Sequence, residues 1–216
     1  MNSPRNRSTL SSPAAFSLVE LLLVLGVLSL LLGLGVSGMD AWKGQTLSTS
    51  GNRFVDYVAM ARQNSIAKNV YTAVVIKTKG DGAYTAFCLL ELSRPDDNSP
   101  STWKQVAPWS TLKTGVVFAP VAASNFLSVS GNPPADLPTN ISFRGKPVDF
   151  SNGVAAQVFQ PDGTLSAGQS VKLRLAEGYV SDADAVTYTR PGNGSGANYY
   201  DIVFVRDSGQ AKIERL

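Results

Sequence analysis

One apolar run near the N-terminus constrains this chain more than any other feature of its sequence. Residues 16–39 read FSLVELLLVLGVLSLLLGLGVSGM, 24 residues in which Glu20 is the only charge. As an α-helix rising about 1.5 Å per residue, the run would extend about 36 Å, enough to cross a bilayer core of about 30 Å. It also explains why charged residues make up only 16% of the chain, against about 25% in typical soluble domains. The run predicts a transmembrane helix over residues 16–39.

The residues before this run predict its orientation. The leader, residues 1–15, is polar, contains Arg5 and Arg7 and has no acidic residue. Because positively charged flanks stay in the cytoplasm, we expect a cytoplasmic N-terminus and a C-terminal part across the membrane. A cleaved secretory signal is disfavoured, because its apolar region spans only about 7–15 residues, and a lipoprotein would need a cysteine earlier than Cys88. An uncleaved membrane anchor remains a possible alternative, although in that case the only role of Glu20 would be to extend its side chain to the membrane interface.

The composition excludes several kinds of catalytic and metal site. The chain has no histidine and one cysteine, Cys88, so it lacks His-dependent nucleophile systems, His-ligated metals and any internal disulfide. Two S-x-x-K matches, at 65–68 and 101–104, lack the companion boxes of acyl-transfer enzymes, and we interpret them as chance. The acids at 96–97 and 182–184 do not fit an EF-hand loop. We expect neither an enzyme nor a cofactor.

Beyond the apolar run the helical pattern continues but becomes amphipathic. Between residues 40 and 68, apolar and small side chains recur at helical spacing along one stripe. The stripe is Leu47, Phe54, Val58, Ala61 and Ser65, with Val55 and Ile66 beside it. We expect a helix over 40–68 whose stripe packs on a sheet. Because GQTLSTSGN at 44–52 is poor in helix formers, a kink or break is expected there.

From residue 69 to 216 the period changes to that of strands. The expected strands cover 70–78, 83–92, 102–109, 115–120, 140–143, 154–160, 171–176, 199–206 and 211–216. Turn residues separate several of them, at 79–82, 161–163 and 207–209. Residues 121–140 are rich in Ala, Ser, Asn, Gly and Pro and are expected to run over the surface. A long helix followed by short strands predicts an α+β fold with antiparallel sheets.

The stretch Ala15-Phe16-Ser17-Leu18-Val19-Glu20-Leu21-Leu22 resembles the prepilin-type cleavage and methylation motif of type IV pilins and type II secretion pseudopilins. In that family a small residue precedes the cut, a Phe follows it, and a Glu is fifth in the mature chain. The family prefers Gly before the cut, where this chain has Ala15. The resemblance implies that a prepilin peptidase cuts between Ala15 and Phe16 and methylates Phe16, and that Glu20 guides subunit assembly.

Three further segments resemble the minor pseudopilin H (GspH/FimT-like) family. Residues 57–76 look like its helix-to-strand junction, 158–176 like its strand-Pro-x-Gly-strand unit, and 200–216 like its closing hairpin. A prepilin-like family of verrucomicrobial gene cassettes (Verru_Chthon cassette protein D) has a comparable layout. The resemblance implies a pilin-like fold, with one long N-terminal helix packed on antiparallel sheets. The insert around 93–140 matches no pattern that we can name.

Nucleic acid is not an expected partner. Some FimT-like pilins bind DNA through Gly-Arg-x-Arg in the last hairpin, whereas this chain has Gly-Gln-Ala-Lys at 209–212. From residue 170 onward it has six basic and six acidic residues, so a phosphate backbone would gain little from counterion release.

Two functions therefore remain. The first is a structural minor pilin or pseudopilin subunit, built into a filament with sister subunits and anchored in the inner membrane with a periplasmic C-terminal domain. The second is a monomeric, membrane-anchored extracytoplasmic binding domain that never polymerises.

Overall fold

The computed structural model describes residues 17–93, 102–122, 125–128, 141–150, 152–189 and 198–214, with the backbone alone for 32–44, 93 and 128. The chain divides into two compact units, Met1–Ala41 and Trp42–Leu216. We treat each by itself and call the second the C-terminal domain. Helix α1 covers Leu18–Lys68 and contributes residues to both units. Within the part of the chain that the structure describes, no helix is both long enough and apolar enough to span a membrane.

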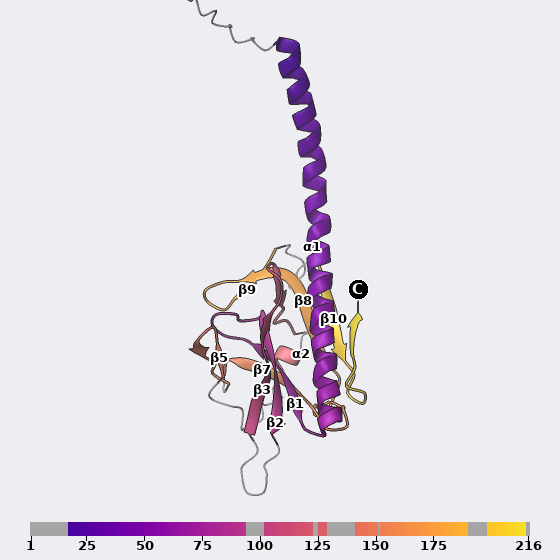
Figure 1. The fold of residues 1–216 in the computed structure, drawn as a ribbon, viewed down its shortest axis with the longest axis vertical. Helices are drawn as coiled ribbons and strands as arrows, with labels where there is room; N and C mark the ends of the chain where they lie inside the picture. The colour runs from indigo at the N-terminus through magenta and orange to yellow at the C-terminus, as the bar shows by residue number, and fades with distance from the viewer. Residues whose placement is uncertain are drawn as a thin grey trace, which may run out of the picture. The chain divides into compact units, whose positions relative to one another are not determined.

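The C-terminal domain combines the last part of α1 with short strands (Figure 1). The elements after α1 are β1 Thr72–Lys77, β2 Ala86–Ser93, β3 Thr102–Thr111, β4 Val116–Phe118, α2 Asn125–Ser128, β5 Ser142–Phe143, β6 Lys146–Pro147, β7 Val154–Phe159, β8 Val171–Val180, β9 Val186–Tyr188, β10 Tyr199–Phe204 and β11 Ala211–Glu214. The expected strand segments are confirmed, with shifted ends. The short strands β6 and β9 were not expected, because they span too few residues for an alternating pattern to reveal them.

The strands form two main sheets. The first has the order β3-β2-β1-β7, and the second has the order β11-β10-β8-β4, with β9 paired to β8. Every pairing between the described strands is antiparallel. This arrangement confirms the predicted α+β class with antiparallel sheets. Because β7 joins β1 from far along the chain, the first sheet depends on contacts between distant segments.

The predicted helix stripe is the contact between α1 and both sheets. Leu47, Phe54, Val58, Ala61 and Ser65 are all 0% exposed, as their helical spacing indicated. The Phe54 ring lies 5.1 Å from that of Phe87 on β2 and 5.0 Å from that of Phe118 on β4, both edge-on. Since β2 and β4 belong to different sheets, Phe54 joins the helix to both in one aromatic core.

Strands β1 and β2 of the first sheet are buried on both faces. One face contributes Val74, Ile76, Phe87 and Leu89 to the core shared with α1. The other face, with Val75 and Cys88, is covered by Ile141, Phe143, Val148 and Phe150. The covering segment contains the β5-β6 hairpin. This double cover explains why β1, TAVVIK, is buried along its whole length.

Two local expectations were wrong. Residues 44–52 are helical, so α1 has no break there; packing of Leu47 and Ser50, both buried, overrides weak helix propensity. Within 121–140, expected as a surface stretch, Asn125–Ser128 form α2, and Phe126 is 0% exposed. Its ring lies 5.4 Å from that of Phe204. One aromatic side chain therefore draws this part of the insert into the core.

Candidate functional site

The first candidate site is the apolar segment Leu18–Leu31, the part of α1 whose side chains the structure describes in the first unit. Its large apolar side chains are all exposed, from 47% at Val24 to 76% at Leu18. They lie on every side of the helix and not along one stripe. A methyl group added at Gly26 would meet no atom within 4 Å. A surface of this kind is stable only when lipid or other apolar helices surround it.

Glu20 lies in the first turn of α1. The carbonyl of Ser17 accepts hydrogen bonds from the backbone N–H groups of Glu20, at 3.0 Å, and Leu21, at 3.1 Å. Ser17 thus begins the helix, and a carboxylate three residues later is favourably placed at the positive end of the helix dipole. Glu20 makes no side-chain hydrogen bond or ion pair with any described residue. No cation of the described residues therefore occupies its carboxylate.

The two residues of the expected cleavage site, Ala15 and Phe16, lie outside the described residues. Cleavage between them and methylation of Phe16 remain predictions, and so does the pairing of the Phe16 amine with Glu20. The transmembrane assignment of 16–39 also remains a prediction.

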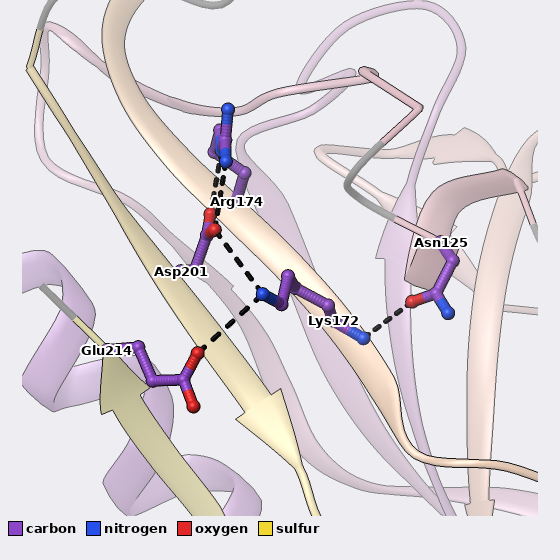
Figure 2. A network of polar contacts seen from close by, with 5 residues as sticks. All are labelled: Asn125, Lys172, Arg174, Asp201 and Glu214. Atoms are coloured by element: carbon purple, nitrogen blue, oxygen red, sulfur yellow. Dashed lines mark hydrogen bonds and ion pairs between the residues drawn. The ribbon is translucent and has the colours of Figure 1, made fainter. Parts of the chain in front are cut away.

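A second polar constellation joins three strands of the second sheet (Figure 2). Asp201 on β10 is 1% exposed and accepts two bonds from Arg174 on β8, Nε to Oδ1 at 2.7 Å and Nη2 to Oδ2 at 2.9 Å. Lys172 Nζ lies 3.8 Å from Asp201 Oδ2 and 3.6 Å from Glu214 Oε2 on β11. The backbone N–H of Lys172 donates to Asn125 of α2 at 2.5 Å. We call these five residues the Asp201 network.

The Asp201 network is structural in character. The Arg174 guanidinium stacks on the Tyr199 ring, 3.7 Å from its centroid. The hydrogen bonds that Arg174 donates to Asp201 raise the pKa of Arg174 above its usual value, against the opposing effect of burial. Since a bidentate Arg–carboxylate pair fixes both partners, the network aligns β8 with β10. In this network two basic residues of the C-terminal third, Lys172 and Arg174, are paired with acids of the same chain.

A third constellation joins α1 to two turns of the domain. Arg62 Nε donates to the carbonyl of Ser208 at 2.6 Å. A Cβ at Gly163 would lie 2.6 Å from Ile66 Cδ1, and one at Gly209 would lie 1.9 Å from the carbonyl oxygen of Gly163. Both glycines have positive φ, 83° and 63°. The segments that resemble the minor pseudopilin family at 57–76, 158–176 and 200–216 thus meet at Arg62, where only glycine fits each turn.

The remaining motifs have ordinary structural roles. In the S-x-x-K match at 65–68, the Ser65 hydroxyl donates to the carbonyl of Arg62 at 2.7 Å, and Lys68 Nζ pairs with Glu91 at 2.6 Å. The lysine amine is therefore not bonded to the serine hydroxyl that it would have to activate. Cys88 is buried, and burial raises the pKa of its thiol, as expected of a small apolar residue. Among the described residues, no group of three Asp, Glu, Cys or His side chains could hold a metal ion.

Sequence reasoning missed the Asp201 network, although signals for it exist. Lys172 and Arg174 stand two positions apart in a strand, so they share one face of the sheet. Asp201 is a lone acid in YYDIVF, and a buried acid requires a cation nearby. What the sequence did not specify is that β8 pairs with β10 in the register that sets Arg174 opposite Asp201.

No protein-family model matches the chain, and the search of curated proteins found none with significant similarity. Among solved structures, the chain is similar to the minor pseudopilin EpsH from the type 2 secretion system of Vibrio cholerae, with 11% sequence identity and a TM-score of 0.41. The match covers 78% of this chain and 94% of that one. At these values the likeness assigns neither a family nor a function to this chain.

Proposed function

We propose that this chain is a minor pilin-like or pseudopilin subunit of a type IV pilus or type II secretion-like filament. The observation that carries the proposal is the apolar segment Leu18–Leu31, exposed on all sides, with Glu20 as its only charge and without a partner among the described residues. The prepilin-like motif at 15–20 precedes it, and an α+β domain follows it.

In this proposal the leader is removed between Ala15 and Phe16 by a prepilin peptidase, which also methylates the new N-terminus at Phe16. The helix then anchors the subunit in the inner membrane, with the C-terminal domain in the periplasm. Each newly made chain thereby presents an amine and a carboxylate four residues apart at the head of an apolar helix.

Glu20 guides assembly in this proposal by pairing with the Phe16 amine of a neighbouring subunit. When apolar helices bundle, every charge between them loses water, and a charge left alone there costs roughly 3–5 kcal/mol. The amine and the carboxylate offset this cost only when they meet. The pairing therefore selects one axial offset between neighbours, while the leucine and valine side chains supply contact area without a preferred register.

A second candidate function is a monomeric, membrane-anchored binding domain. The observation that favours it is that the C-terminal domain buries its own core and pairs its buried acid Asp201 internally. The domain thus needs no neighbour for its own stability. In this case Glu20 would lie at the membrane interface and contact water.

Crosslinking distinguishes the two candidates. The wild-type chain and Glu20→Ala are compared at equal membrane levels, co-expressed with sister pilins, after mass spectrometry has identified the first residue of the mature chain. We expect N-methylated Phe16 as that residue. Glu20→Ala should insert at least as well as wild type, because an apolar residue replaces an acid, but its crosslinks should fall about tenfold or more. Glu20→Asp should be intermediate, because it keeps the charge and shortens its reach.

Equal crosslinking of Glu20→Ala and wild type would reject the assembly role and favour the monomeric anchor. A mature chain that begins at Met1, or near Gly38, would reject prepilin-type processing itself. Leu25→Ala is the matched control, because it changes the same helix by one apolar side chain and leaves the charge in place.

A further inference from the structure

Three turns of the C-terminal domain line a cleft of about 580 Å³ that is open to solvent. It is lined by the β1-β2 turn around Gly80 and Asp81, by the β3-β4 connection from Thr111 to Gly115, and by the β8-β9 turn from Tyr179 to Asp184. Its volume lies within the range of roughly 300–1,000 Å³ typical of small-molecule sites. We call it the turn cleft. It does not involve the apolar segment, the Asp201 network or the Arg62 contact.

The turns around the cleft are held together by specific bonds. Asp184 Oδ1 accepts a hydrogen bond from the backbone N–H of Gly80 at 2.8 Å, which ties the β8-β9 turn to the β1-β2 turn. Arg144 Nη1 lies 3.3 Å from Asp81 Oδ1. The Gly178 N–H donates to the carbonyl of Gly115 at 3.0 Å. The walls therefore belong to the fold and do not depend on a bound molecule.

Two residues of the wall have unusual backbone conformations. Arg144 and Asp184 adopt positive φ, 50° and 58°, a region that side chains with a Cβ rarely occupy. Such conformations cost free energy and persist where the surrounding structure requires them. Here they hold two charged side chains at the rim of one cleft.

Polar side chains of the cleft remain available to a ligand. Lys113, Thr114, Tyr179 and Asp182 make no side-chain hydrogen bond or ion pair with any described residue. The Lys113 ammonium can donate hydrogen bonds, the Asp182 carboxylate can accept them, and the hydroxyls of Thr114 and Tyr179 can do both. The ring of Tyr179 belongs to a side chain that is 59% exposed, so an aromatic surface also faces the solvent here.

The charges limit the chemical class of the ligand. The lining contains three acids, Asp81, Asp182 and Asp184, against two bases, Lys113 and Arg144. Because this balance is close to neutral, neither a polyanion nor a polycation gains much from long-range attraction. A largely apolar ligand is equally disfavoured, since charged and hydroxyl groups form much of the wall.

We infer that the turn cleft binds a neutral saccharide. The hydroxyls of a sugar both donate and accept, which matches the mixture of carboxylates, cations and threonine hydroxyls. The C–H face of a sugar ring can pack on the Tyr179 ring, while the polar side chains fix its orientation. This site is independent of the filament proposal, because every lining residue belongs to the C-terminal domain.

The test is binding of three probes, maltotetraose, cellotetraose and N-acetylchitotetraose, to the full chain. The chain is kept in a detergent without sugar headgroups, because maltosides and glucosides would compete for the cleft. Saturation-transfer NMR detects binding, and titration gives the affinity. We expect at least one probe to bind, with Tyr179→Ala weakening it about tenfold, the scale of a lost aromatic contact. Asp182→Asn should weaken it several-fold.

Tyr71→Ala is the matched control, because Tyr71 is 42% exposed and lies outside the cleft; it should bind as wild type does. Circular dichroism confirms that each variant is folded. The inference is overturned if none of the three probes binds at millimolar concentration, if Tyr179→Ala binds as tightly as wild type, or if Tyr71→Ala weakens binding equally. Preferential binding of oligogalacturonate or oligolysine would overturn it as well, because a charged ligand would then be the better fit.

Discussion

The two parts of helix α1 present their apolar residues in different ways. In Leu18–Leu31 the large apolar side chains are 47–76% exposed, on every side. From residue 45 to 68 the stripe that begins at Leu47 and contains Phe54 is 0% exposed. The other side is mostly polar, with Met60 and Ile66 as its exposed large apolar residues. A single stripe can be covered by sheets of the same chain. A helix that is apolar all round cannot be covered in this way along a single stripe.

An acid of the C-terminal domain and the acid of the apolar segment also differ in their partners. Asp201 is 1% exposed and has two cations within its own chain, Arg174 and Lys172. Glu20 has none among the described residues. The buried acid of the domain is therefore paired within the chain, whereas the acid of the apolar segment has no partner among the described residues.

The largest expected effect is the loss of a buried side chain from the second part of α1, compared with an exposed side chain from the first part. Phe54→Ala should lower the free energy of unfolding of the C-terminal domain by about 3–5 kcal/mol, because it leaves a cavity between the helix and both sheets. Leu25→Ala should change it by less than about 0.5 kcal/mol, because Leu25 is 52% exposed. Urea unfolding of the full chain in detergent, followed by tryptophan fluorescence, measures both values. Similar losses in the two variants would contradict the comparison.

The next effect separates the buried acid from the exposed ones. Asp201→Asn should lower the free energy of unfolding by about 2–4 kcal/mol, because it leaves the Arg174 cation with a weaker, uncharged partner in a buried position. Glu20→Gln should leave the domain unchanged. The same unfolding measurement applies.

Asp207→Asn provides a second control. The Asp207 side chain is 91% exposed and lies 3.8 Å from Arg206, and an exposed pair of this kind contributes at most about 1 kcal/mol. A loss in Asp207→Asn that equals the loss in Asp201→Asn would mean that burial does not determine the strength of these pairs.

The smallest effect is alkaline sensitivity of the domain. Burial raises the pKa of the Cys88 thiol above its ordinary value of 9.0, so the folded thiol stays protonated where the unfolded one ionises. The unfolded chain then loses its proton first, so stability that is fully present below the ordinary thiol pKa is lost as the pH rises through it, by at most about 1.4 kcal/mol per pH unit. The free energy of unfolding, measured from pH 8 to 9.5, should fall more steeply in wild type than in Cys88→Ala.

Parallel slopes in the two chains would show that the thiol is not protected by the fold. Tyr57 is a separate contributor, because burial also raises the pKa of its phenol above 10.0. Its effect begins at higher pH than that of Cys88, so the two can be resolved. The segment Leu18–Leu31 contains no cysteine, tyrosine or lysine, and it should not contribute.

The sequence predicted features that depend on local periodicity. The stripe from Leu47 to Ser65 and the burial of Cys88 follow from the side chains themselves and their spacing along a helix or strand. The helix through 44–52 did not follow in this way, because packing of Leu47 and Ser50 outweighs a weak propensity. Glu20 could be identified from the sequence because it is the only charged residue in the apolar run 16–39.

Other features depend on segments that lie far apart in the chain. Phe126 is buried because α2 meets β7 and β8, which no period in 121–140 could reveal. The turn cleft combines turns near residues 80, 113 and 182, and each turn alone is ordinary turn chemistry. Arg144 and Asp184 could not be recognised as cleft residues, because left-handed backbone at these positions is imposed by the surrounding structure.

The sequence by itself determined that this chain has an apolar helical segment with one acid, an amphipathic helix and a series of short strands. These are properties of neighbouring residues, whose spacing matches a helix or strand period. Only the tertiary structure decided that β7 pairs with β1, that Asp201 meets Arg174, and that three separate turns enclose one cleft. Such contacts join residues far apart in the chain, and their geometry follows from the packing of the whole domain and not from any single segment.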